Sequence, residues 1–390
     1  MSRRVSFLVP DIGAPSVGAA VRMAESLRGA CECEIVGPDF GRGVNSMYRT
    51  DLQFHAIPCP RLYRLPNFWW ESRRLERALT GDVIVAVKAF RNTVPLALRA
   101  RARRGATVAV FLDEWDGGVL SALSPAERRL RRWKQWHHPL EDGHYPSVEA
   151  LIPEADIVLS TTTFLQRRFG GNVIAMGVDT ERFKPQPPED VHALKESLGL
   201  SGKRIIVFGG VVRPHKGVEI IPEALARIAD DSIRLLVVGP ITEHLRQLMA
   251  NPRYARWIQV AGAPEHDPQG INTAIHKQMP LYLDLADLIV LPLLDNPLAQ
   301  SQMPMKLFEA MAMAKPIIGS AVSDLPLVLK DCGCVTPPQD IEGLGRAIRS
   351  LLEHRQDSVN LGRMARTRCV EQFARPVVGS RLRTLLLGRT

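Results

Sequence analysis

Two opposite charges on one predicted helix suit the binding of a polyanionic ligand. Residues 301–320, SQMPMKLFEAMAMAKPIIGS, predict a helix from Pro304 to about Ala314, because proline fits a first turn, where its missing N–H would be unpaired anyway. Lys306 falls in that turn, where the helix dipole disfavours a cation, so we expect an anionic partner. Glu309 shares its face, and the two can neutralise each other or both face a bound ligand.

Two further cations, Arg213 and Lys216, follow the predicted strand IIVFGG, residues 205–210, and precede a helix expected to start near Val218. An ammonium binds oxygens as a point charge, whereas a guanidinium forks across two of them, so the pair suits a diphosphate. Both would stabilise negative charge on such a diphosphate. The alternative is a solvated basic loop.

Three acids, Asp113, Glu114 and Asp116, follow the predicted strand TVAVFL, residues 107–112. They lie at the carboxyl edge of a parallel sheet, where such folds hold their ligands. The cluster can contribute to a site, ligate a metal or form a solvated loop. Of the three, Asp113 is our candidate for a site residue.

The elements that must position these side chains alternate between strand and helix. Strands are expected at 4–10, 33–38, 82–90 and 107–112, with helices between them, which predicts a parallel α/β sheet. The first loop carries Gly18 but lacks the three-glycine dinucleotide fingerprint, so no nicotinamide cofactor is expected. The backbone at Gly18 can bind an anion or simply relieve crowding.

The second half of the chain repeats the pattern. Residues 184–190, KPQPPED, predict a linker because clustered prolines interrupt regular structure, which places a domain boundary near 186. After a last strand at 332–335, two helices are expected to finish the chain.

Length and composition agree with two soluble domains. The chain has 390 residues, 45% hydrophobic and 23% charged, and no apolar run long enough to span a bilayer. The apolar segment near the N-terminus is too short for a signal-peptide core, so a cytoplasmic location is expected, and the six cysteines are expected to be reduced thiols. The net charge of +9 suits an anionic partner. Charge alone does not distinguish between a nucleic acid, a phosphorylated substrate and an acidic membrane surface.

Three stretches carry a resemblance to a known family. PMKLFEAMAMAKPIIGS, GVDTERFKP at 177–185 and RIIVFGGVVRPHKG at 204–217 resemble signatures of GT-B-type retaining glycosyltransferases of family 4, the glycosyltransferase group 1. The resemblance implies an α/β GT-B fold, with two Rossmann-like domains whose parallel sheets face each other across a cleft. It implies an acceptor-side domain at 1–185, a donor-side domain at 186–372 and a terminal helix at 373–390 that returns to the first domain.

The resemblance also implies an activity, namely transfer of a sugar from a nucleoside-diphosphate donor with retention of configuration, in cell-envelope or other glycoconjugate biosynthesis. The nucleotide sugar is a substrate, no cofactor or metal is expected, and the acceptor is not identified. Asp113, Lys216 and Glu309 are the expected catalytic residues. The expected donor-binding residues are Gly18, Gly210, Arg213, Lys216, Met303, Pro304, Met305, Lys306 and Glu309.

Two departures from the family pattern leave a second interpretation open. Ser301 stands where relatives commonly have a glutamate, and Val211 stands where they have an arginine. The chain can therefore be a catalytically silent homologue that binds a nucleotide sugar or a partner. Nucleic-acid binding is not expected, because the charges are scattered and the six tryptophans are not interleaved as stacking platforms.

A basic helix is predicted from about Pro125 to His138, with Ser124 and Glu127 as its capping box. It carries five cations and only one acid, and Leu130 and Trp133 belong to an apolar stripe at helical spacing. Such a helix can dock a protein peripherally on an anionic membrane, here at the inner face, next to a lipid-linked acceptor. Alternatively, the stripe can pack onto the N-terminal sheet.

Overall fold

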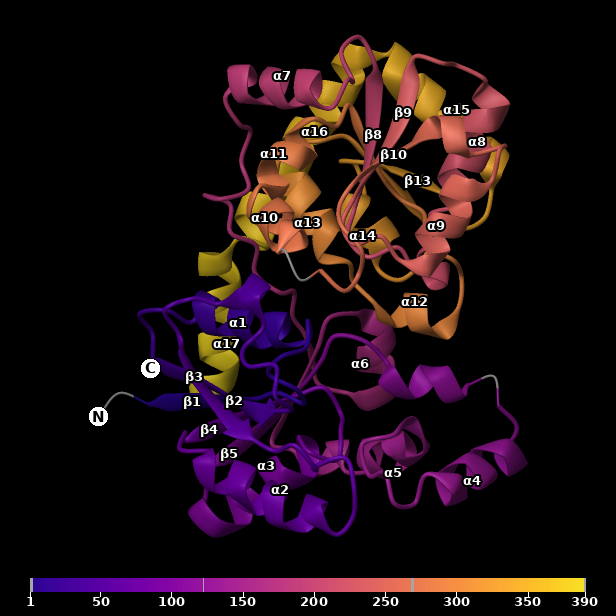
Figure 1. Cartoon of the computed structure of the whole chain (residues 1–390). Coiled ribbons are helices and arrows are strands. Elements are labelled where there is room, and N and C mark those ends of the chain that lie inside the picture. Colours follow the sequence, from indigo (N-terminus) through magenta and orange to yellow (C-terminus); the bar gives the residue numbers. More distant parts are fainter. Residues whose placement is uncertain (1–2, 122, 268–269, 389–390) are drawn as a thin grey trace. The chain divides into compact units, whose positions relative to one another are not determined.

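The computed structural model describes residues 3–121, 123–267 and 270–388. The chain divides into two compact units, each of which is described separately below (Figure 1). Unit 1 comprises residues 1–177 and 375–390, and unit 2 comprises residues 178–374, whereas the sequence placed the boundary near 186. Within the described ranges, no helix is both long and apolar enough to cross a bilayer.

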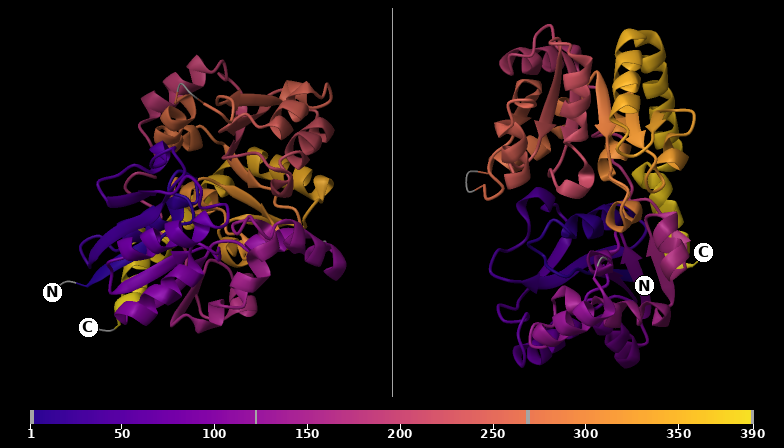
Figure 2. Two further views of the ribbon diagram at one scale, coloured as in Figure 1. Left: turned by 60° about the horizontal axis from the view of Figure 1, so that its bottom comes forward. Right: turned by 90° about the vertical axis from the view of Figure 1, so that its right-hand side faces the viewer.

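Unit 1 contains a seven-stranded parallel sheet with the order β3-β2-β1-β4-β5-β6-β7. Helices cover both of its faces (Figures 1 and 2). The strands are β1 (Arg4–Leu8), β2 (Glu32–Asp39), β3 (Gln53–Pro58), β4 (Val83–Val87), β5 (Thr107–Leu112), β6 (Ile157–Ser160) and β7 (Asn172–Val173). The helices are α1 (Val17–Ser26), α2 (Asn67–Ala78), α3 (Val94–Arg104), α4 (Pro125–Lys134), α5 (Tyr145–Glu149), α6 (Thr163–Phe169) and α17 (Arg375–Leu387).

Burial on both faces explains the strand sequences of unit 1. All five residues of β4, VIVAV, are buried, because a central parallel strand contacts helices on either side and so needs a continuous apolar run. Leu75 and Leu79 at the end of α2, together with Leu96 and Ala97 of α3, pack into one core cluster against this sheet. The core thereby fixes the carboxyl ends of β4 and β5, where the three acids lie.

Unit 2 contains a six-stranded parallel sheet with the order β10-β9-β8-β11-β12-β13. The strands are β8 (Arg204–Gly209), β9 (Ile233–Val238), β10 (Ile258–Ala261), β11 (Leu288–Leu291), β12 (Ile317–Ser320) and β13 (Cys334–Thr336). The helices are α7 (Pro188–Ser197), α8 (Ile220–Ile228), α9 (Glu243–Ala250), α10 (Ile271–Lys277), α11 (Met279–Asp284), α12 (Pro297–Ser301), α13 (Met305–Ala312), α14 (Leu325–Leu329), α15 (Ile341–Glu353) and α16 (Arg355–Gln372).

Several elements and boundaries differ from those predicted. Strand β3 was not predicted, because four of its six residues are only partly buried at the sheet edge and give no apolar run. Three helices follow the last strand where two were expected, since His354 leaves helical geometry between α15 and α16. Helix α4 ends at Lys134 rather than His138, and α8 begins at Ile220, so that Lys216 lies in a separate 3-10 turn.

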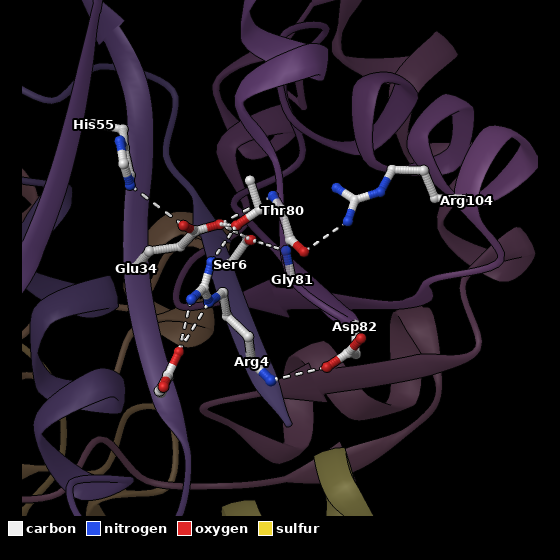
Figure 3. Close-up of polar contacts among 9 residues, drawn as sticks. Arg4, Ser6, Glu34, His55, Thr80, Gly81, Asp82 and Arg104 are labelled. Carbon is white, nitrogen blue, oxygen red and sulfur yellow. Dashed lines mark hydrogen bonds and ion pairs between the residues drawn. The ribbon is translucent and has the colours of Figure 1, made fainter. Parts of the chain in front are cut away.

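A buried carboxylate ties together the amino-terminal side of the unit 1 sheet (Figure 3). Glu34 is 1% exposed and accepts hydrogen bonds from the hydroxyl of Ser6 and from both the N–H and the hydroxyl of Thr80, at 3.0 and 2.8 Å. Its other oxygen lies 3.3 Å from Nε2 of His55. Burial opposes ionisation of this carboxyl, but the hydrogen bonds from Ser6 and Thr80 outweigh it and lower the pKa of Glu34.

We expect Glu34→Gln to lower the free energy of unfolding by about 1–3 kcal/mol at pH 7, because the amide loses the charge that strengthens these hydrogen bonds. The folded-state pKa of Glu34 is the lower one, so its contribution is present above the unfolded pKa of about 4.3 and is lost as the pH falls through the folded value. Urea titrations at several pH values measure this. Glu32→Gln is the control, since its side chain is 58% exposed, and an equal loss there would contradict the argument.

Candidate functional site

Three glycines bring the loops of unit 2 together at the carboxyl edge of its sheet. Gly210, Gly239 and Gly262 follow β8, β9 and β10, and the first two have φ of +121° and +153°. A Cβ on Gly239 would lie 2.5 Å from the carbonyl oxygen of Gly210, and one on Gly262 would lie 1.8 Å from that of Gly239. Side chains are therefore excluded, and backbone forms this edge. Only Gly210 was predicted as a site residue, although each of the others also ends an apolar strand.

The predicted charge pair lies beside this edge. Lys306 Nζ and Glu309 Oε2 are 2.5 Å apart, and Glu309 is 3% exposed. The stem of Lys306 passes over Gly209, where an added Cβ would lie 3.3 Å from the lysine Cδ and Cε. The two charges therefore neutralise each other in this structure. The loop that carries Arg213 and Lys216 begins beside them, directly after Gly209.

That loop is anchored by its backbone. Pro214–Lys216 forms a 3-10 turn and Gly217 has φ of +60°, with its Cα so close to the next loop that a Cβ would lie 2.3 Å from the Pro292 carbonyl oxygen. The carbonyl of His215 accepts a hydrogen bond from the N–H of Leu294, at 3.2 Å. Arg213 is exposed and Lys216 is half-buried.

Helix α13 begins one residue after its predicted start at Pro304 and ends at Ala312 rather than near Ala314. Pro304 is the N-cap, Met305 is the first helical residue, and Met303 before them is buried. The first N–H groups of a helix have no acceptor within it, so this end can bind an anion. Ser301, at the position where a glutamate was expected, is fully buried and donates its hydroxyl to the carbonyl of Leu298, at 2.7 Å.

In unit 1 the three acids surround a buried lysine that the sequence analysis missed. Lys88 follows β4 with φ of +67°, and its side chain is 7% exposed. Its Nζ lies 3.4 Å from Asp113 Oδ1 and 3.1 Å from Asp116 Oδ1, and it also contacts Glu114 Oε1. A lone lysine that ends the all-apolar run VIVAV was the available signal. Of the alternatives left open for the three acids, the solvated loop is therefore wrong, since the acids form an ion cluster with Lys88.

The electrostatics of this Lys88 cluster keep the lysine protonated and raise the pKa of two of its acids. Burial would lower the pKa of Lys88, but the charges of Asp113, Asp116 and Glu114 outweigh it and hold that pKa well above its ordinary value. Burial also raises the pKa of Asp113, and raises the pKa of Asp116 to about 7. Among the described residues, no group of three or more histidine, cysteine or acidic side chains is arranged to hold a metal ion.

Gly18 has a steric role in the structure. It is buried in the first turn of α1, and an added Cβ would lie 2.6 Å from the ring of Tyr48. The guanidinium of Arg22, one turn along the helix, stacks on the same ring at 5.6 Å. Of the predicted residues, the structure thus groups Gly210, Lys306 and Glu309 in unit 2 with the loop of Arg213 and Lys216, whereas Gly18 and Asp113 belong to unit 1.

Comparisons with known proteins agree with this architecture. Residues 202–354 match the family model of the glycosyl transferases group 1. A D-rhamnosyltransferase, WbpZ of Pseudomonas aeruginosa, is 24% identical over 249 residues, which cover 63% of this chain and 61% of that protein. The GDP-mannose-dependent alpha-(1-6)-phosphatidylinositol monomannoside mannosyltransferase of Mycobacterium tuberculosis is 23% identical over 353 residues, covering 86% of this chain and 84% of that one.

Solved structures give the fold. The crystal structure of Anabaena Alr3699/HepE in complex with UDP-glucose has a TM-score of 0.73 with 17% identity, and the match covers 99% of this chain and all of that one. Sucrose-phosphate synthase from Thermosynechococcus elongatus also has a TM-score of 0.73, with 18% identity and 98% of each chain covered. Together with the two parallel sheets, these matches confirm the predicted resemblance: the protein has the GT-B fold, and residues 202–354, within its second unit, match the model of the glycosyl transferases group 1.

Proposed function

We propose that the protein transfers a sugar from a nucleoside-diphosphate donor to an acceptor with retention of configuration, in the synthesis of a cell-envelope or other glycoconjugate. The observation that carries the proposal is the grouping at the carboxyl edge of the unit 2 sheet. There the buried Glu309, its partner Lys306 and the loop of Lys216 surround the backbone edge formed by the glycines. The proposal places this chemistry in the cytoplasm.

Each group has a role that fits its chemistry. The carboxylate of Glu309 can accept hydrogen bonds from both hydroxyls of a ribose, each worth about 1.5–3 kcal/mol when charge-assisted. The N–H groups at the start of α13 and the cation of Lys216 suit a diphosphate, with Arg213 as a second cation. These interactions strengthen as the diphosphate leaves, and the nucleotide sugar acts as substrate without any cofactor or metal. Asp113 remains our candidate beside the reacting sugar.

The donor is best sought among the nucleotide sugars that relatives use. The mycobacterial relative is GDP-mannose-dependent, and the Anabaena structure holds UDP-glucose. The test incubates the protein with GDP- and UDP-sugars and candidate acceptors, follows the products by mass spectrometry and assigns the new anomeric centre by NMR. Release of nucleoside diphosphate with a retained anomeric configuration supports the proposal, and an inverted product overturns it.

A second candidate is a silent GT-B homologue that binds a nucleotide sugar without transferring it. Ser301 favours this alternative, because its hydroxyl bonds to Leu298 within its own helix and supplies no carboxylate. The two candidates differ in one measurement. A silent homologue binds nucleotide sugars by calorimetry but shows neither transfer nor slow hydrolysis of any donor it binds.

The ribose role of Glu309 predicts a loss of nucleotide affinity. We expect Glu309→Gln to weaken binding of the nucleoside diphosphate by about 1–3 kcal/mol, because an amide supplies one neutral acceptor where the carboxylate has two charged ones. Titration calorimetry measures it. Glu243→Gln is the matched control, since Glu243 also pairs with a cation three residues away in sequence, Arg246 at 3.0 Å, but on the exposed surface of α9. Unchanged affinity in Glu309→Gln would reject the ribose role.

A further inference from the structure

Among the described residues of unit 1, none buries the apolar stripe of helix α4. None of its ten residues is buried, and Leu130 and Trp133 are 50% and 69% exposed. The alternative that this stripe packs onto the N-terminal sheet is therefore wrong. The capping box of Ser124 and Glu127 is present as predicted, so the helix is stabilised locally while its apolar side faces solvent.

Three of the five cations on α4 are available for a partner. Arg131 pairs with Asp142 at 2.7 Å, and Arg128 donates to the backbone carbonyls of Ser121 and Leu123. In the part of the chain that the structure describes, Arg129, Arg132 and Lys134 form no ion pair and all three are exposed. Of the acids nearby, Glu127 caps the helix and Asp142 holds Arg131, whereas Glu141 is exposed.

A second segment, which the sequence analysis did not connect with α4, contacts the residues that follow this helix. The N–H of Leu65 donates to the carbonyl of His137 at 3.2 Å, and Nδ1 of His138 lies 3.2 Å from the carbonyl of Tyr63. These contacts join the loop before α2 to the segment after α4, and both helices lie along the lower border of unit 1 in Figure 1. Residues 61–73 and 124–138, which are joined at these contacts, are together called the aromatic–basic surface.

The exposed tryptophans of the protein all belong to this surface. Of the six in the chain, Trp69 and Trp70 on α2 are 57% and 64% exposed, and Trp133 and Trp136 are 69% and 62% exposed, whereas Trp257 is buried and Trp115 half-buried. Exposed arginines lie among them: Arg64 stacks on Tyr63 at 5.4 Å and Arg73 on Trp70 at 5.5 Å. Solvent-exposed tryptophan is unfavourable unless the apolar ring meets an interface.

We propose that the aromatic–basic surface docks on an anionic lipid bilayer. Cations beside an anionic leaflet gain electrostatic energy, and tryptophan rings are most stable at headgroup depth, so one surface that presents both fits a bilayer better than a soluble polyanion. The docking itself is independent of sugar transfer. It rests on the proposed function only in naming the acceptor as a lipid-linked molecule that unit 1 reaches from the membrane surface.

Vesicle flotation tests the proposal with the full chain. Wild type is expected to float with phosphatidylcholine vesicles that contain phosphatidylglycerol at low salt, and to remain behind with phosphatidylcholine alone. Reversal of three cations, Arg129→Glu, Arg132→Glu and Lys134→Glu, should lower the bound-to-free ratio at least tenfold. The control reverses three exposed, unpaired arginines of unit 2, Arg346, Arg349 and Arg355, with the same change in net charge, and should retain binding.

The tryptophans separate a bilayer from another acidic partner. Trp69→Ala with Trp70→Ala should lower the bound-to-free ratio at least threefold, and brominated lipids should quench the tryptophan fluorescence of the bound wild type. Failure of wild type to float at low salt, equal loss in the unit 2 control, or no effect of the tryptophan pair would each overturn the proposal. Lys216→Ala should float like wild type, so that loss of transfer and loss of docking are distinguished.

Discussion

Replacing Lys88 by methionine should lower the free energy of unfolding by about 3–5 kcal/mol at pH 8, because it leaves three partly buried carboxyls without their cation. Methionine preserves most of the length of the side chain, so the loss reflects charge more than packing. The lysine side chain is 7% exposed, and its Nζ reaches Asp113, Glu114 and Asp116. Urea titration measures the change.

The pH dependence of this loss has a definite sign. Lys88 has a raised folded-state pKa, so its contribution is fully present below its unfolded pKa of about 10.4 and stays constant between pH 5 and 8. The carboxyls vary instead. Burial raises the pKa of Asp116 to about 7, and without Lys88 this carboxyl is still more readily protonated. The effect of Lys88→Met should therefore be smaller at pH 5, where a proton replaces the missing cation, than at pH 8.

Two further variants make this prediction specific. Asp116→Asn in the Lys88→Met background removes one of the unpaired charges and should recover part of the stability at pH 8. Lys134→Met is the matched control in unit 1, since Lys134 is exposed on α4, and it should change stability by less than about 0.5 kcal/mol. Equal losses in Lys88→Met and Lys134→Met, or a greater loss at pH 5 than at pH 8, would contradict the ion cluster.

The Lys88 cluster shows where sequence reasoning stops. The strand VIVAV and the acids after residue 112 follow directly from apolar runs and chain position, so their place at the carboxyl edge could be predicted. That Lys88 meets those acids requires β4 and β5 to be neighbours, as their register of Val87 against Phe111 makes them. Strand order is a property of the assembled sheet and not of either segment.

Local sequence signals predicted helix α4 itself, but they could not predict which of its side chains are exposed. Helix α4 was predicted with its capping box, because capping depends on residues three positions apart. Whether Trp133 would be buried depends on every other element of unit 1, and the sequence left both outcomes open. The same limit applies to Trp69 and Trp70, whose relation to α4 arises from the contacts of Leu65 and Tyr63 with residues 137 and 138.

On the donor side, Lys216→Ala is expected to reduce turnover about 10²–10³-fold while it weakens donor binding by less than about tenfold. The diphosphate gains negative charge as the sugar–phosphate bond breaks, so a cation held beside it stabilises the transition state more than the bound donor. The turn that carries Lys216 is fixed by the close approach of Gly217 to Pro292 and by the hydrogen bond from Leu294 to His215, so the backbone that carries this cation is in place before the charge develops. Single-turnover kinetics with the donor found in the screen separate the two quantities.

Lys203→Ala is the matched control, because Lys203 precedes β8 and Lys216 follows it, so the two lysines lie at opposite ends of one strand. Lys203 donates to the carbonyl of Asp231 at 2.9 Å, away from the glycine edge, and its loss should leave turnover unchanged. Lys216→Arg should restore part of the rate, since a guanidinium keeps the charge but changes its geometry. If Arg213→Ala lowers turnover and Lys216→Ala does not, then the exposed arginine, and not Lys216, is the cation that meets the leaving diphosphate.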